Sequence, residues 1–206
     1  MTATVEVMPS WSGAAHARSI AATAMRLTYK VQAHGAHHVG TSGPAVLVTR
    51  CEGLLAGTVL HATVPRPVHV LANAAMMAAL RQGLMTRAGV IPVDAPTAIG
   101  AQHAARAAIA DERAVALTGS TVDPAYLLAT TGAPLIPVVM LGVSGRVPTD
   151  PPRPRSRIDV YYFDPVEVQV SGDPLGASVR AGVAEQVRQA LTDAERIASV
   201  RAGRSE

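Results

Sequence analysis

Aromatic side chains are scarce in this sequence, where only 3% of the 206 residues are Phe, Trp or Tyr. Proteins that bind single-stranded nucleic acid stack bases on aromatic rings, so this class of protein is disfavoured. Charge does not point to nucleic acid either, because 18 basic and 15 acidic residues leave a net charge of only +3. We therefore expect no nucleic-acid partner and a core of Ala, Val, Leu, Ile and Met.

Cysteine occurs only once, at Cys51. A single cysteine excludes an internal disulfide and a cysteine-based zinc site, and such sparing use is typical of cytosolic proteins. Three histidines lie close together and could bind a metal with an acidic residue: His34, His37 and His38, with Glu6 or Asp94. Their spacing in a glycine-flanked loop is a weak pattern for a metal site, so we expect adventitious binding at most, with no resident metal and no cofactor.

Long apolar runs are also missing. The longest stretch without a charged residue, 124–145, is interrupted by threonine, glycine and proline at 130–132, 134 and 137. Such a stretch predicts a helix end, a turn and a buried strand rather than a membrane-spanning helix. The N-terminal residues lack a basic segment followed by an apolar one, so no secretory signal is predicted and we expect a cytoplasmic location.

Strand-like and helix-like segments alternate through the chain. Short apolar runs predict a strand that ends at Asp94 and strands at 44–49, 68–71, 114–117, 134–141 and 158–163. Amphipathic or alanine-rich segments predict helices at 19–31, 52–63, 74–81, 98–110, 125–131 and 177–200. This order predicts an α/β layered domain with a mostly parallel central sheet flanked by helices. No linker divides the chain, so we expect one domain over 1–206, whose first 40 residues form a helical segment.

Two segments could meet an anionic or lipid surface. The 19–31 helix has an apolar stripe beside two basic residues, namely Ile20, Ala24, Leu27 and Val31 beside Arg26 and Lys30. The 148–157 segment contains four prolines and predicts an exposed basic loop with Arg153, Arg155 and Arg157. A surface helix that packs on the core is the simpler interpretation of the first segment. Peripheral contact with the inner face of a membrane is the alternative.

Five segments follow one another in an order that carries a resemblance: Val46–Leu55, Gly89–Asp94, Ala116–Thr121, Ala133–Gly142 and Arg157–Val166. In this order the chain resembles the glycerolipid acyltransferase family, which moves a fatty acyl group from acyl-CoA or acyl carrier protein to 1-acylglycerol-3-phosphate and related alcohols. The resemblance covers about residues 43–168 and implies the α/β fold of that family. The Gly89–Asp94 and Ala133–Gly142 segments match its strand motifs best.

The chemical positions of the resemblance differ from those of the family. The resemblance implies a histidine base at position 50 and an aspartate at position 55 that orients it, but the sequence has Arg50 and Leu55 there. A guanidinium stays charged and cannot accept a proton. The simpler interpretation of Arg50 is an ion pair with Glu52 or Asp94, and the functional one is a clamp on a phosphate or carboxylate.

The remaining candidate residues are weaker. The third segment, Ala116–Thr121, keeps small polar residues but lacks the Glu and Arg of the family. The resemblance therefore leaves an anion-binding turn at Thr118, Gly119, Ser120 and Thr121. Arg87 comes just before the second segment, Gly89–Asp94, and is a further candidate. A plain turn is the commoner interpretation. Cys51 follows a strand and opens a predicted helix, where a helix dipole and Arg50 would favour the thiolate and allow a nucleophile; a buried filler is the commoner interpretation. His61, His69 and His103 are predicted to be packed or surface residues.

These observations predict a retained fold without the usual reaction. We expect a catalytically impaired homologue that binds an acyl thioester, such as acyl-CoA or acyl carrier protein, or an active acyltransferase partner. The alternative is a working acyltransferase with a rebuilt site, which would use proximity and oxyanion stabilisation to transfer the acyl group to a non-standard acceptor.

Overall fold

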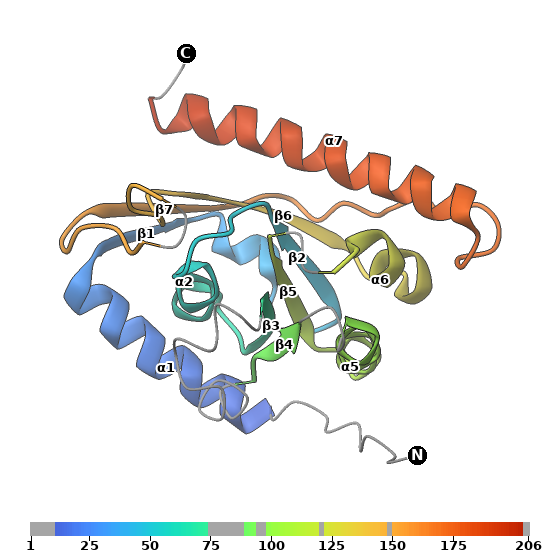
Figure 1. Ribbon diagram of the computed structural model, residues 1–206, viewed down its shortest axis with the longest axis horizontal. Helices are drawn as coiled ribbons and strands as arrows, with labels where there is room; N and C mark the ends of the chain where they lie inside the picture. Colours follow the sequence, from blue (N-terminus) through green and yellow to red (C-terminus); the bar gives the residue numbers. More distant parts are fainter. Residues whose placement is uncertain (1–10, 74–88, 94–97, 120–121, 148–149, 204–206) are drawn as a thin grey trace.

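A computed structural model describes residues 11–73, 89–93, 98–119, 122–147 and 150–203 (Figure 1). Its elements before the first gap are α1 (Trp11–Thr28), β1 (Lys30–His34), the 3-10 helix η1 (Ala36–Val39), β2 (Ala45–Thr49), α2 (Ala56–Thr63) and β3 (Val68–Asn73). The later elements are β4 (Ile91–Val93), α5 (Ala98–Ala110), β5 (Ala114–Thr118), α6 (Pro124–Thr131), β6 (Leu135–Leu141), β7 (Arg157–Tyr162) and α7 (Ala177–Arg201).

The described strands form one sheet in the order β1-β7-β6-β2-β5-β3-β4. Neighbouring strands run parallel except β6 and β7, which are antiparallel. The central strands β2 and β5 are buried along their whole length, which explains their continuous apolar sequences. The predicted α/β layered fold with a mostly parallel sheet is confirmed.

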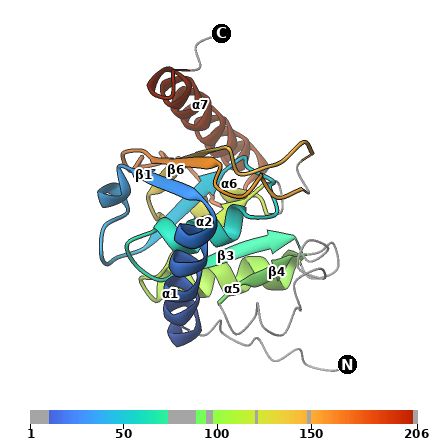
Figure 2. The same cartoon turned by 90° about the vertical axis from the view of Figure 1, so that its left-hand side faces the viewer.

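Helices cover both faces of the sheet (Figures 1 and 2). One apolar cluster joins α1 and α2 to the sheet through residues such as Met25, Val59 and Leu60. A second cluster joins α5, α6 and α7 to the opposite face, and it includes Leu128 and Val187. The C-terminal half of α7 extends across β6 and β7, where Ala194 and Ala198 pack on the sheet.

Local signals explain why α6 forms where the sequence predicts it. The Asp123 carboxylate accepts a hydrogen bond of 2.9 Å from the Ala125 amide, and Pro124 occupies the first turn. Gly132 ends the helix in the left-handed conformation, with φ of 65°. The predicted helices at 98–110 and 177–200 are confirmed as α5 and α7.

The prediction of a helix at 19–31 is wrong at both ends. The helix α1 begins at Trp11 and ends at Thr28, and Lys30 and Val31 belong to β1. Pairing of β1 with β7 stabilises these residues as a strand, although their side-chain spacing fits a helix. The predicted helix at 52–63 also begins later, because α2 starts at Ala56.

The apolar stripe predicted for the first helix also needs correction. Ile20 and Leu27 are exposed to 70% and 81%, whereas the buried side of α1 is formed by Ala14, Ala21 and Met25. Small alanine side chains let α1 approach α2 closely, and this tertiary contact determines which side of the helix is buried. The predicted helix at 74–81 lies outside the described residues.

Candidate functional site

The candidate site lies where β2 ends. In an open parallel sheet, ligands bind outside the carboxyl ends of the strands. Thr49 is the last residue of β2, and β5 and β6 run parallel to it on its two sides. The turn 50–53 therefore emerges at the edge of the sheet where this rule places a site.

A cavity of about 470 Å³ opens at this turn. Its lining comes from the turn 49–53, the end of β6 at 138–141, Ser144 and the α7 residue Glu195. Charged residues and the aliphatic residues of β6 therefore both contribute to the lining. A cavity of this size lies within the range that binds small ligands and cofactors.

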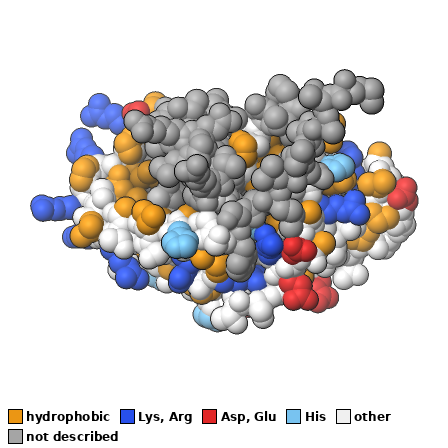
Figure 3. All heavy atoms as spheres, turned by 90° about the horizontal axis from the view of Figure 1, so that it is seen from below, with side chains coloured by type: hydrophobic (Ala, Val, Ile, Leu, Met, Phe, Trp, Pro, Cys, Tyr) orange, Lys and Arg blue, Asp and Glu red, His pale blue; other side chains and the backbone are white. Residues whose placement is uncertain are grey.

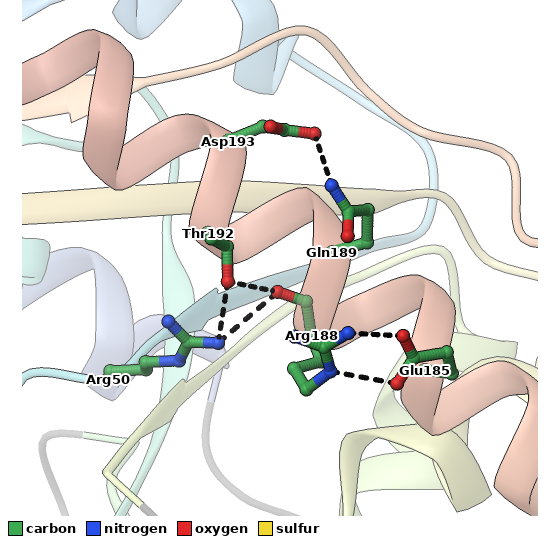
Figure 4. Close-up of polar contacts among 6 residues, drawn as sticks. All are labelled: Arg50, Glu185, Arg188, Gln189, Thr192 and Asp193. Carbon is green, nitrogen blue, oxygen red and sulfur yellow. Dashed lines mark hydrogen bonds and ion pairs between the residues drawn. The ribbon is translucent and has the colours of Figure 1, made fainter.

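Arg50 crosses the gap between the sheet and α7. Its Nη1 donates a hydrogen bond of 2.6 Å to Glu195 Oε2. Its Nη2 lies 3.2 Å from the carbonyl oxygen of Arg188 and 3.3 Å from Thr192 Oγ1, as Figure 4 shows. The ion pair is open to solvent, since the two side chains are 42% and 41% exposed. An exposed pair of this kind contributes about 0 to 1 kcal/mol, so a ligand anion can compete with Glu195 for the guanidinium.

The partner of Arg50 therefore differs from the expected ones. The sequence favours Glu52 or Asp94, but the ion pair is made with Glu195, 145 residues away. Arg188, Thr192 and Glu195 share one side of α7 because they are four and three residues apart. The sequence shows this spacing, but it does not show that Arg50 faces this side of α7. Asp94 lies outside the described residues.

α7 carries its own polar contacts beside this site. Arg188 forms an ion pair with Glu185, and Gln189 Nε2 lies 3.1 Å from Asp193 Oδ2 (Figure 4). Thr192 Oγ1 donates a hydrogen bond of 2.9 Å to the Arg188 carbonyl, the same oxygen that accepts from Arg50. On this side of α7, Arg188 is thus paired along the helix, whereas Glu195 is paired with Arg50.

The surroundings of Cys51 fit a partly buried filler better than a nucleophile. Burial raises the pKa of the Cys51 thiol above its ordinary value; a hydrogen bond from the Gly53 backbone opposes the shift, and the Glu52 charge adds to it. The expected stabilisation of the thiolate fails because α2 begins only at Ala56 and Arg50 reaches toward α7. The thiol is therefore protonated at neutral pH, a poor state for a nucleophile.

The third segment of the resemblance, which includes the end of β5 at Thr118 and the turn at Gly119, lies next to the first. Thr118 ends β5 in register with Thr49, and the Gly119 amide donates a hydrogen bond of 3.2 Å to the Thr49 carbonyl. A Cβ on Gly119 would lie 2.9 Å from Glu52 Cγ, so the two turns are in close contact. The Thr118 hydroxyl donates to the Leu71 carbonyl within the sheet.

The other predicted positions divide into two groups. Leu55 is the residue before α2 and packs against the apolar cluster of α1 and α2, where it offers no ionisable group. Three predicted anion-binding residues lie outside the described residues: Arg87, Ser120 and Thr121. The structure therefore brings together Arg50, Cys51 and the Thr118–Gly119 turn.

Comparison with known proteins supports the fold. No model of a known protein family matches the sequence, and no curated protein matches it. The structure is similar to the crystal structure of the 1-acyl-sn-glycerophosphate (LPA) acyltransferase PlsC from Thermotoga maritima, with a TM-score of 0.62. The match covers 88% of this chain and 79% of that chain at 13% sequence identity. The chain has an acyltransferase fold.

In this acyltransferase fold, no histidine is among the described residues that line the cavity. His34 Nε2 lies 3.2 Å from Asp159 Oδ1, in the pairing of β1 with β7, and His38 Nδ1 lies 2.9 Å from Asp164 Oδ1. Burial raises the pKa of the Asp159 carboxyl, but hydrogen bonds from Arg157 and His34 outweigh it and the pKa lies below its ordinary value. These histidines thus have carboxylate partners of their own, away from Arg50.

Within the described ranges, no helix combines the length and the apolar character needed to cross a bilayer. The charge-free stretch 124–145 contains α6, Gly132 and β6, as the sequence predicts.

Proposed function

We propose that this acyltransferase-like chain binds an acyl thioester in the cavity at Arg50 without transferring its acyl group. The observation that carries the proposal is Arg50 itself, which lies at the end of β2 and lines the cavity. Transfer of an acyl group to an alcohol needs a base that takes the hydroxyl proton. A guanidinium offers no lone pair for that proton, so the usual reaction lacks its first step.

The same cavity suits a ligand with an acyl chain and an anionic carrier. Val139, Met140 and Leu141 offer aliphatic surface for the chain. Arg50 offers charge-assisted hydrogen bonds to a phosphate, in place of those that it now donates to Glu195. The turn at Thr118 and Gly119 is adjacent, and its Gly119 amide donates to the Thr49 carbonyl, which holds this turn beside the end of β2.

Titration calorimetry with palmitoyl-CoA, and with CoA alone, tests the binding. We expect the chain to bind palmitoyl-CoA and Arg50→Ala to weaken binding by about tenfold or more, as loss of a charge-assisted hydrogen bond does. Glu195→Gln is expected to tighten binding, because it removes the carboxylate that competes for Arg50. Arg180→Ala, an exposed change on the first turns of α7, is the matched control and is expected to have no effect.

A transfer assay completes the test. With palmitoyl-CoA and 1-acylglycerol-3-phosphate, mass spectrometry is expected to find no acylated product above the protein-free background. Product that disappears in Arg50→Ala would refute the proposal, and so would failure of the parent protein to bind palmitoyl-CoA.

A rebuilt acyltransferase is the second candidate function, and one feature of the cavity favours it. Cys51 Sγ and Ser144 Oγ both approach Gly53, at 3.5 Å and 2.7 Å from the position that a Cβ would take there. A thiol and a hydroxyl therefore line the same wall. Incubation with a panel of acyl thioesters and alcohol or amine acceptors should give a product that Cys51→Ala or Ser144→Ala removes; absence of any product eliminates this candidate.

A further inference from the structure

Charges of both signs line the cavity at the end of β2. Arg50 Nη1 lies 2.6 Å from Glu195 Oε2, and both residues belong to the lining. Glu52 lines the cavity as well, and its Oε1 would lie 3.5 Å from a Cβ on Gly119. Among the described lining residues these three are the charged ones, so carboxylates outnumber cations. A ligand that brings only negative charge therefore meets negative charge already in the lining.

The guanidinium of Arg50 is held on α7 by more than its bond to Glu195. Its Nη2 lies 3.2 Å from the Arg188 carbonyl oxygen and 3.3 Å from Thr192 Oγ1, and both of these acceptors are neutral. The bond from Nη1 to Glu195 can therefore open while Nη2 keeps the guanidinium in place. The pair is partly exposed and hence weak, so the Nη1 position is the one where a ligand exchanges with the protein.

The charge balance of this exchange determines which head group fits. An anion that replaces Glu195 at Nη1 leaves the carboxylate beside a second negative charge, and the repulsion opposes binding. A cation that pairs with Glu195 leaves Arg50 beside a second positive charge. A head group that carries both charges, a few bonds apart, fits between the two residues: its oxyanion accepts from Arg50 and its ammonium group pairs with Glu195. Each charge then keeps a partner.

We propose that the cavity selects a zwitterionic amphiphile, whose head group joins an oxyanion to an ammonium group, and that Glu195 determines this selectivity. The apolar chain of the ligand would lie against Val139, Met140 and Leu141 of β6. The inference rests on the proposed function in one respect, that Arg50 binds a ligand head group, and it does not require a thioester. Glu195 disfavours a ligand with negative charge alone and favours one that also brings a positive charge.

Three amphiphiles with the same dodecyl chain test the selectivity. They are dodecylphosphocholine, which carries both charges, dodecyl phosphate, which is anionic, and dodecyltrimethylammonium, which is cationic. Titration calorimetry of the full chain uses each of them below its micelle concentration and at low ionic strength, where exposed charges are screened least. We expect dodecylphosphocholine to bind at least roughly threefold more tightly than either of the others.

Glu195→Gln provides the decisive comparison, because the amide keeps the size of the side chain and removes its charge. We expect this variant to bind dodecylphosphocholine roughly threefold more weakly and dodecyl phosphate more tightly by a similar factor. Changes of opposite sign for two ligands with the same chain cannot come from damage to the fold. Asp193→Asn is the matched control, since this carboxylate of α7 lies beside Gln189 (Figure 4), and it is expected to change neither affinity.

Binding outside the cavity is identified with Arg50→Ala. Basic side chains gather along the left margin of the face in Figure 3, which is turned away from α7, and they can attract dodecyl phosphate without selectivity. Only the binding that Arg50→Ala weakens is assigned to the cavity.

The outcomes separate this inference from the proposed function. Equal affinity for the three amphiphiles, no binding of any of them, or a change of the same sign for both ligands in Glu195→Gln would overturn the inference. If dodecylphosphocholine binds in a manner that depends on Glu195 but palmitoyl-CoA does not bind, the inference stands and the proposed function fails.

Discussion

Replacing His61 with leucine is expected to make the protein more stable, and most strongly so in acid. His61 lies on α2 with 5% of its surface exposed, and within the described part of the chain neither ring nitrogen has a hydrogen-bond partner. An unsatisfied buried polar group costs about 1–3 kcal/mol. Leucine fills a similar volume without that cost, so we expect His61→Leu to raise the free energy of unfolding at pH 7 by about 1–2 kcal/mol.

Acid adds a second effect at this histidine. Burial lowers the pKa of His61 from 6.5 to about 4, and the nearby His69 contributes to the shift. Above pH 6.5 the ring is neutral in the folded and unfolded states alike. As the pH falls toward 4 only the unfolded state takes up the proton, so the parent protein loses up to about 3 kcal/mol of stability from this group.

Urea unfolding measured between pH 7 and pH 4.5 tests the prediction. His61→Leu should unfold at higher urea than the parent throughout, and the gap should widen as the pH falls. Part of the acid sensitivity should remain, because burial also lowers the pKa of His69. His103→Leu removes an exposed imidazole from α5; it is the control and should unfold at the same urea concentration as the parent at each pH. Parallel curves for His61→Leu and the parent would contradict the prediction.

Replacing Gly142 with alanine is expected to lower the free energy of unfolding by about 2–5 kcal/mol. Gly142 follows β6 with φ of 76°, a conformation that costs an alanine about 1–2 kcal/mol. A Cβ there would also lie 2.4 Å from the carbonyl oxygen of Arg157, a backbone atom at the start of β7 that cannot rotate away. Relief of this clash requires β6 and β7 to separate, which adds about 1–3 kcal/mol.

Gly132 provides a matched control for this change. It has a similar φ of 65°, but nothing lies within 4 Å of the position of its Cβ. Gly132→Ala should therefore show the conformational cost alone, about 1–2 kcal/mol. Thermal unfolding of the two variants separates the contributions, and equal destabilisation would show that the contact with Arg157 is relieved without cost. We also expect Gly142→Ala to weaken ligand binding, since Leu141 lines the cavity.

Most elements were predictable from the sequence because their signals are local. The apolar runs of β2, β5 and β6 have few alternatives to a buried strand, and the caps of α6 are encoded within three residues of its ends. The prediction of a helix at 19–31 failed because the contacts that decide the structure there are not local. The residues of this segment fit a helix through Val31, and only the hydrogen bonds with β7 explain why β1 begins at Lys30.

The candidate site shows the same division. The end of β2, with Arg50, is identifiable from the strand pattern and from the resemblance to glycerolipid acyltransferases. Glu195 is not, because its place opposite Arg50 depends on how α7 packs over the sheet. The thiolate interpretation of Cys51 is disfavoured, because the residues after β2 extend for several positions before α2 begins and burial raises the pKa of the thiol.

The sequence by itself determined that position 50 carries a permanent positive charge, that the core is aliphatic, and that strands alternate with helices. These are properties of side-chain chemistry and of local spacing, which need no knowledge of distant contacts. Only the tertiary structure decided that Arg50 faces Glu195, that Ile20 and Leu27 point to solvent, and that the 150–157 loop lies beside α1. Each of these depends on which surfaces pack together, and that choice minimises the free energy of the whole chain rather than of any one segment.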